Sequence, residues 1–164
     1  MAALREVAFV KGHGTENDFI LIPDLDGRLD LTAEQVRVLC DRRQGLGADG
    51  ILRVVRSARV PEAADRAPVA EFFMDHRNAD GSLAEMCGNG ARVFVRYLDA
   101  VGLITDPEVT IATRGGLRTA RMNEDLSVTI DMGMATPPRA KAAVQVTVDE
   151  RSWPATGVHV PNPR

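Results

Sequence analysis

Hydrophobic and polar positions alternate along this chain of 164 residues in two different patterns. Short apolar runs bounded by Gly, Pro, Asn or Asp predict β-strands, and apolar residues three or four positions apart predict helices. The expected strands are 7–12, 19–23, 51–56, 69–76, 83–86, a hairpin over 108–122, 126–133 and 144–148. Loops are expected at 13–18 and, exposed to solvent, at 57–68. The pattern predicts an α+β fold with about seven or eight strands and two helices.

The two expected helices carry recognisable start signals. The first spans 31–43, where Thr32 is a suitable N-cap that opens a capping box. The second begins at Gly88 or Asn89 and stops near Gly102. Its expected apolar face consists of Val93, Phe94, Tyr97, Leu98 and Val101. This second helix is apolar enough to be wrapped by a sheet.

Composition and charge exclude several classes of protein. The chain is 45% hydrophobic and 26% charged, which is typical of a soluble globular protein with one core. Its net charge of −3 argues against a general nucleic-acid-binding surface. No apolar run reaches the roughly 18 residues of a membrane span, and the first residues lack the apolar region of a signal peptide. We therefore expect a cytoplasmic protein whose two cysteines, Cys40 and Cys87, are reduced.

The stretch "AEMCGNGARVF" (84–94) carries the candidate chemistry. It places Cys87 directly before Gly-Asn-Gly at a predicted helix start, whereas Cys40 is expected in the core. The first N–H groups of a helix are unpaired and carry about half a positive charge, which stabilises a thiolate and also binds a carboxylate. One short stretch can therefore bind an acidic substrate and present a base to it. The alternative is a buried cysteine before an ordinary helix.

The residue types available in the sequence limit the kinds of reaction that a thiolate at Cys87 can catalyse. A cysteine hydrolase needs a histidine partner, and nothing in the sequence brings His13, His76 or His159 to Cys87. A pyridoxal-phosphate racemase needs a Schiff-base lysine, and neither of the two lysines in the chain lies in a recognisable cofactor context. Metal-ligand clusters at the usual spacings are not found. What remains is cofactor-free proton abstraction at carbon, with the thiolate as general base.

Four stretches resemble the successive signatures of the diaminopimelate epimerase family: "KGHGTENDF" (11–19), "DRRQGLGADGIL" (41–52), "RNADGSLAEMCGNGARVF" (77–94) and "VHVPNP" (158–163). The resemblance covers the whole chain. It implies two similar halves, each a mixed, mostly antiparallel sheet around a central helix, with the substrate in the cleft between them. Two cysteines on opposite faces of the α-carbon then interconvert LL- and meso-2,6-diaminopimelate, a step of lysine and peptidoglycan precursor biosynthesis, without a cofactor.

The resemblance also implies roles for individual residues. Cys87 matches the first of the two catalytic cysteines. Substrate binding is implied for the side chains of Asn17, Asn78 and Asn162 and for the backbone N–H groups of Gly88 and Asn89. Taken without the resemblance, the first two asparagines are explained by turn chemistry. The expected partner is a small molecule, the amino acid diaminopimelate. No metal, nucleic acid or membrane is expected to bind. The resemblance leaves open whether the chain forms a homodimer.

Three features depart from the family pattern. Gly50 stands where some members carry a substrate-contacting glutamine, and His76 stands where an aromatic residue is frequent, at the expected edge of the cleft. The third departure is that the sequence stops at Arg164, before the second cysteine of the pattern. We therefore expect a first half-domain over 1–131 and the incomplete start of a second over 132–164, inactive without a second thiol.

Two other functions are compatible with the same residues. One is a non-catalytic module or remnant that keeps the carboxylate-binding site. The other is a different cofactor-free isomerase of the same fold, similar to proline racemase or to a phenazine-pathway isomerase. The "MCGNG" context favours diaminopimelate epimerase over these other isomerases.

Overall fold

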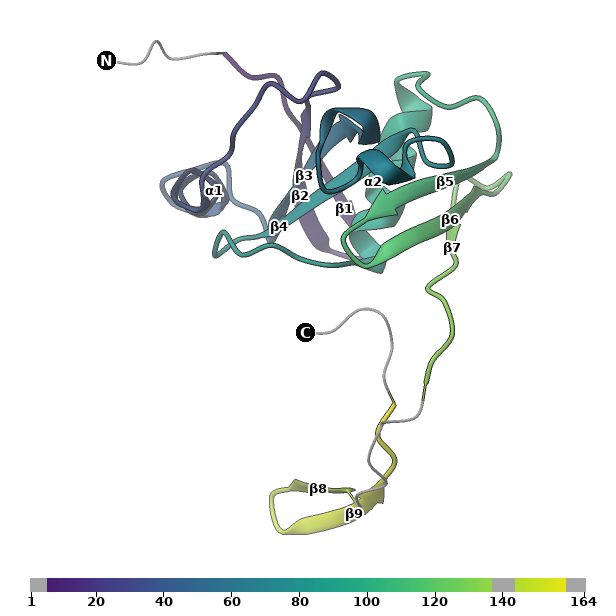
Figure 1. The fold of residues 1–164 in the computed structure, drawn as a ribbon. Helices are drawn as coiled ribbons and strands as arrows, with labels where there is room; N and C mark the ends of the chain where they lie inside the picture. The colour runs from purple at the N-terminus through teal and green to yellow at the C-terminus, as the bar shows by residue number, and fades with distance from the viewer. Residues whose placement is uncertain (1–5, 137–143, 159–164) are drawn as a thin grey trace.

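The computed structural model describes residues 6–136 and 144–158. These ranges contain nine strands and two α-helices (Figure 1). The strands are β1 (Val10–Gly14), β2 (Asn17–Pro23), β3 (Gly50–Arg56), β4 (Phe72–Asn78), β5 (Glu108–Thr113), β6 (Gly116–Met122), β7 (Val128–Ile130), β8 (Val144–Val148) and β9 (Arg151–Ala155). The helices are α1 (Ala33–Cys40) and α2 (Gly88–Ala100), with short 3₁₀ turns η1 (Ser57–Arg59) and η2 (Ala64–Arg66).

Strands β1 to β7 form one sheet in chain order, and β8 and β9 form a separate antiparallel hairpin. Within the large sheet, β2–β3 and β4–β5 are parallel pairs and the other four pairs are antiparallel. Parallel neighbours need a crossover connection, and α1 and α2 supply the two that are required. The predicted mixed, mostly antiparallel sheet is therefore confirmed. The expected division at 131 and 132 stays a prediction, with β7 ending just before it.

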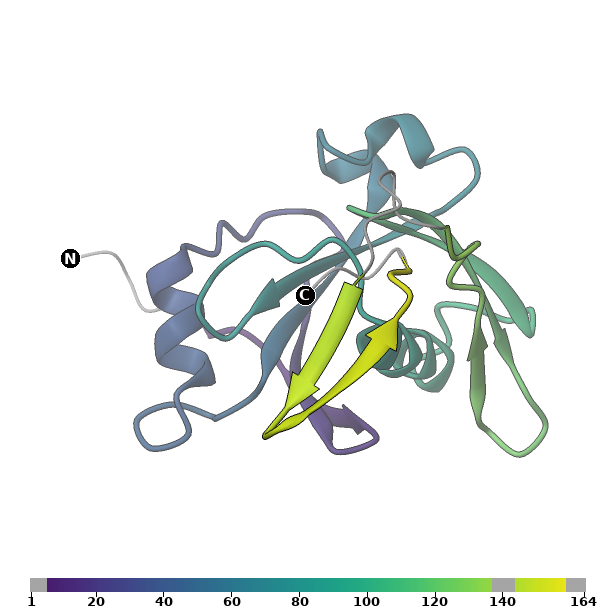
Figure 2. The same ribbon diagram turned by 90° about the horizontal axis from the view of Figure 1, so that it is seen from below.

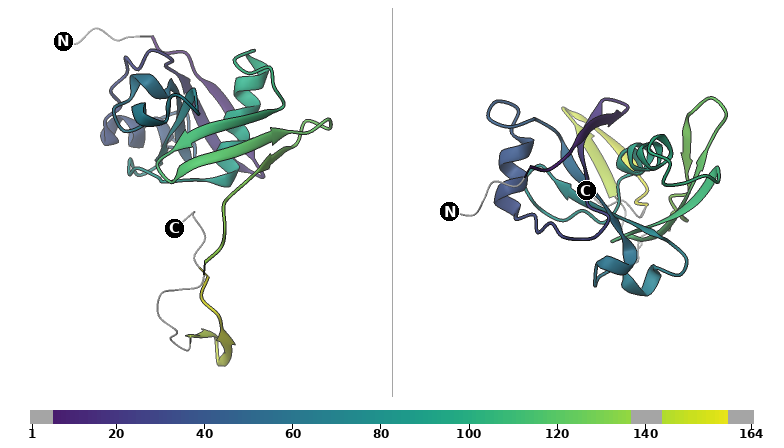
Figure 3. Two further views of the ribbon diagram at one scale, coloured as in Figure 1. Left: turned by 45° about the vertical axis from the view of Figure 1, so that its right-hand side comes forward. Right: turned by 90° about the horizontal axis from the view of Figure 1, so that it is seen from above.

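Helix α2 lies inside the curve of this sheet, and α1 covers the opposite side of β2 to β4 (Figures 2 and 3). Along β2, Phe19 and Leu21 pack in the α2 cluster, while Ile20 and Ile22 pack in the α1 cluster. Because successive side chains of a strand point to opposite faces, this strand is apolar on both sides and reads as an unbroken hydrophobic run. The prediction of a helix wrapped by a sheet is confirmed for α2.

The helix starts follow local signals. Thr32 accepts a hydrogen bond from the backbone N–H of Gln35 at 3.2 Å, and the Gln35 side chain accepts one from the Thr32 N–H at 2.9 Å. The predicted capping box is thus confirmed. Helix α1 ends at Cys40 rather than at residue 43, because Asp41 is extended and its carboxylate accepts the N–H groups of Arg43 and Gln44. Helix α2 ends before Gly102, whose φ of +71° needs glycine.

Some sequence predictions were wrong in detail. The loop expected at 13–18 is a tight β1–β2 turn, with Thr15 and Glu16 at φ of +52° and +67°, so the strands continue almost to it. Residues 83–86 form only an isolated bridge between Leu83 and Arg77 instead of a strand. Strand β9 was not predicted at all.

Burial differs from expectation at two further places. The segment 57–68 is not a wholly exposed loop, because η1 and η2 fold it back and bury Val60 and Ala63 against Phe73. Val101 is 50% exposed and does not belong to the buried face of α2. Phe94 and Leu98 do belong to it, as predicted.

Candidate active site

A cavity of about 620 Å³ lies in front of the N-terminus of α2. Its wall comes from β2, from the turn before β3, from the end of β4 and from the loop that leads into α2. The lining residues are Asn17, Phe19, Asp49, His76, Asn78, Leu83, Ala84, Glu85, Met86 and Cys87. Three predicted site residues, Asn17, Asn78 and Cys87, therefore meet at one cavity although they come from separate segments.

Cys87 is the N-cap of α2 and is only 8% exposed. Its backbone is extended and its carbonyl accepts the Ala91 N–H at 2.8 Å, the first hydrogen bond of the helix. Its sulfur accepts the backbone N–H of Gly90 at 3.4 Å. That N–H and the positive end of the helix dipole stabilise negative charge on the sulfur. The thiol is therefore placed to act as a base toward a ligand in the cavity.

Asn17 is held in place by charged neighbours. Its Nδ2 donates to Asp49 Oδ2 at 2.7 Å, and the other oxygen of Asp49 accepts from Arg42 at 2.9 Å. The side-chain oxygen of Asn17 consequently faces the other way, where Cys87 Sγ lies at 3.8 Å and Asn89 Nδ2 at 3.4 Å. This chain of contacts orients an amide at the cavity wall.

The end of β4 forms another part of the wall. Asn78 Nδ2 donates to Ser82 Oγ at 2.9 Å within the turn that follows the strand. His76 is 5% exposed and packs edge-to-face on Phe19, with ring centroids 5.6 Å apart. Burial, reinforced by the charge of Arg114, lowers the pKa of His76 to about 4, so the imidazole is neutral near pH 7. Its Nδ1 is buried without a hydrogen-bond partner among the described residues.

The remaining predicted residues lie beside this cavity or outside the described ranges. Gly88 and Asn89 are the first two residues of α2, and their backbone N–H groups donate to no described residue. Neither lines the cavity, although Asn89 contacts Asn17. Gly50 is buried, and a Cβ there would lie 2.6 Å from the Arg77 carbonyl oxygen. Asn162 lies outside the described residues.

Two acidic residues of the wall, Asp49 and Glu85, were not singled out from the sequence. Asp49 had a usable signal, since it sits in a glycine-rich turn directly before a strand, where polar side chains face a sheet edge. No sequence signal indicated Glu85. His76 was expected at the edge of a cleft, and it is instead a buried part of the cavity wall.

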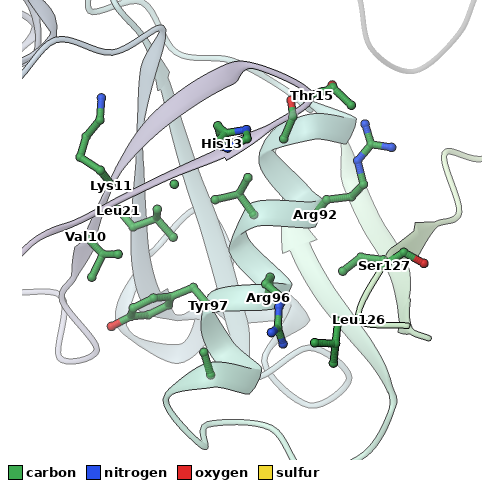
Figure 4. Close-up of a pocket in the computed structure, with 15 residues that line it drawn as sticks. Val10, Lys11, His13, Thr15, Leu21, Arg92, Arg96, Tyr97, Leu126 and Ser127 are labelled. Carbon is green, nitrogen blue, oxygen red and sulfur yellow. Dashed lines mark hydrogen bonds between the residues drawn. The ribbon is translucent and has the colours of Figure 1, made fainter. Parts of the chain in front are cut away.

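A second cavity, of about 530 Å³, lies between β1, α2 and the start of β7 (Figure 4). Its labelled side chains include His13, Arg92, Tyr97 and Leu126. Cys87 does not line it. The candidate base therefore belongs to the first cavity.

Neither a metal-binding cluster nor a membrane-spanning helix occurs in residues 6–136 and 144–158. No three His, Cys, Asp or Glu side chains there are grouped closely enough to hold a metal ion. In the same ranges, no helix has the length and apolar character needed to cross a membrane.

Solved structures with a similar fold include an epimerase and a phenazine biosynthesis protein. A hydroxyproline epimerase from Agrobacterium vitis superimposes with a TM-score of 0.58 at 16% identity, over 91% of this chain and 47% of that one. A phenazine biosynthesis protein from Bacillus anthracis gives a TM-score of 0.51 at 21% identity, over 76% of this chain and 38% of that one. At such identities the likeness shows the fold alone. The chain has the fold class that these proteins share, the α+β fold expected from the sequence.

The family follows from the sequence comparisons. A family model described as diaminopimelate epimerase matches residues 9–137. The diaminopimelate epimerase of Streptomyces coelicolor is 54% identical over 157 residues, covering 96% of this chain and 54% of that protein. The diaminopimelate epimerase of Thermobifida fusca is 56% identical over 129 residues, covering 76% of this chain and 47% of that protein. The chain belongs to the diaminopimelate epimerase family, and it spans about half the length of the curated relatives it matches.

Proposed function

We propose that this chain supplies one of the two proton-transfer thiols, Cys87, of a diaminopimelate epimerase. The observation that carries the proposal is the position of Cys87 Sγ, which accepts the Gly90 N–H and lines the same cavity as Asn17 and Asn78. Family membership supports the substrate, 2,6-diaminopimelate, and a place in lysine and peptidoglycan precursor biosynthesis.

In the proposed reaction, the substrate's α-carboxylate binds at the N-terminus of α2 through the N–H groups of Gly88 and Asn89. The Cys87 thiolate then removes the α-proton: the C–H bond breaks, an S–H bond forms, and the electron pair stays on the α-carbon, delocalised onto the carboxylate. The two N–H groups stabilise that developing charge. A second thiol on the other face of the carbon delivers a proton, which inverts the centre.

The second thiol is not Cys40. Cys40 is 4% exposed and packs with Val36 and Ile51 in the α1 cluster, on the side of the sheet away from α2. Burial also raises the pKa of the Cys40 thiol, which disfavours its thiolate. The proposed partner of Cys87 is therefore a cysteine of a second half-domain. That cysteine, like Cys87, would stand at a glycine-rich helix start.

The other parts of the proposal concern binding and location. Asn17, Asn78 and Asn162 bind the polar groups of diaminopimelate, and the reaction uses neither cofactor nor metal. The reaction takes place in the cytoplasm, which fits the two free thiols, Cys40 and Cys87.

The test is epimerisation by the full-length product of the coding region, assayed in D₂O. We expect LL-diaminopimelate to become the meso isomer with deuterium at the α-carbon, and Cys87→Ser to lower the rate by roughly 10²–10⁴-fold, the usual contribution of a general base. Cys40→Ser is the matched control and should keep the rate. Binding of diaminopimelate without deuterium uptake would favour a non-catalytic carboxylate-binding module instead.

A further inference from the structure

The turn between β5 and β6 contacts two parts of the wall of the Cys87 cavity, the end of β4 and the loop that leads into α2, although it does not line the cavity itself. Arg114 contacts the end of β4, and its side chain is only 11% exposed. Its guanidinium donates to both carboxylate oxygens of Glu62, at 3.0 and 2.7 Å, and to Asp75 Oδ1 at 2.7 Å. It also donates to the backbone carbonyl of His76 at 3.0 Å. Arg114 is thus fixed by four acceptor atoms of three residues and in turn holds the end of β4.

The next residue, Gly115, contacts the loop that leads into α2. Its backbone N–H donates to the carbonyl of Glu85 at 2.7 Å. A Cβ at position 115 would lie 3.2 Å from Met86 Cβ and 3.3 Å from the Glu85 oxygen. The backbone of this turn is therefore packed directly against the two residues that precede Cys87.

Arg114 and the segment before Cys87 also meet at one carbonyl group. The carbonyl of His76 accepts from Arg114 and also from the Ala84 N–H at 3.1 Å. Both His76 and Ala84 line the cavity. The segment 83–87 has no strand or helix of its own, so few backbone hydrogen bonds hold it. Its position depends on these links to β4 and to the β5–β6 turn.

We propose that Arg114 is a positioning residue of the Cys87 cavity, which holds segment 83–87 against the end of β4 and thereby keeps Cys87 in place at the N-terminus of α2. Arg114 touches neither Cys87 nor the residues that would bind the substrate. Its relevance to catalysis rests on the proposed function. The effect of Arg114 on the position and exposure of Cys87 is independent of the proposed function.

The test measures the alkylation rates of the two thiols in one sample, by mass spectrometry after brief treatment with iodoacetamide. In Arg114→Met the buried acceptors lose their donor and segment 83–87 opens more often, so the Cys87 to Cys40 rate ratio should rise about fivefold. Arg114→Lys keeps the charge but reaches fewer acceptors, and should give a smaller rise. Arg56→Met, which removes the exposed Arg56–Glu71 ion pair, is the matched control and should leave the ratio unchanged.

A second variant covers the case in which Arg114→Met does not fold. Gly115→Ala leaves the charges intact but inserts a methyl group against Met86, and should change the ratio in the same direction. General destabilisation raises both rates together, so an unchanged or lower ratio in both variants would overturn the proposal. The readout needs no substrate. Absence of epimerase activity would therefore refute the proposed function and leave this result standing.

Discussion

The sulfur of Cys87 lies between the backbone N–H of Gly90, at 3.4 Å, and the side-chain oxygen of Asn17, at 3.8 Å. The N–H stabilises the thiolate, whereas the oxygen can accept the proton of the thiol. A residue that takes a proton in one direction of a reversible epimerisation must return it in the other. Cys87 thus has a hydrogen-bond partner for its thiolate and another for its thiol, as expected of a group that acts both as base and as acid.

This geometry predicts the effect of a charge at position 17. In Asn17→Asp, a carboxylate replaces the neutral oxygen beside the sulfur and disfavours the thiolate. Iodoacetamide should then alkylate Cys87 roughly fivefold more slowly at pH 7.5. Asn123→Asp, in the β6–β7 turn, is the matched control. Equal rates in both variants would show that Asn17 does not influence the thiol.

The two cysteines should differ in reactivity in the unmodified protein. Cys87 lines a cavity and caps a helix, whereas Cys40 is buried in the α1 cluster, where burial raises its pKa. Brief alkylation should label Cys87 first, as peptide mapping can show. Faster labelling of Cys40 would remove the special status of Cys87.

His76 should make stability depend on pH. Its native pKa is lowered to about 4 from 6.5, so between these values the unfolded chain binds a proton that the native protein does not. The free energy of unfolding should fall as the pH decreases through this window, by about 3 kcal/mol in total from this group. His76→Phe should show a shallower fall in urea titrations at pH 7 and pH 4.5. A ring that titrates near 6.5 by NMR would contradict the burial argument.

The 164 residues by themselves should not epimerise diaminopimelate. The sequence contains two cysteines, and only Cys87 lies at the cavity, so one face of the α-carbon lacks its acid. We expect neither meso product nor α-deuterium uptake from LL-diaminopimelate in D₂O. Turnover that disappears in Cys87→Ser would mean that another group, such as a histidine, serves as the second acid.

Much of the fold was readable from neighbouring residues. The capping box of Thr32 and Gln35, the start of α2 after Cys87, and the strands around Ile20, Ile51 and Ile111 all follow from contacts or periodicity within a few positions. Such signals are local, because helix caps and strand alternation involve residues close in sequence. The same local pattern singled out Cys87 as the candidate base.

The assembly of the cavity could not be read that way. The neighbours of Cys87 come from β2, β4 and the turn before β3, and sheet register and packing around α2 decide which of their side chains meet. The contact of Asn17 with Asp49 and the contacts of Arg114 join residues 32 or more positions apart in the sequence. The placement of His76 inside the wall depends on burial, which is decided by the packing of the whole sheet. Long-range contacts of this kind leave no periodic signal in the chain, because they exist only once the sheet has closed around its helix.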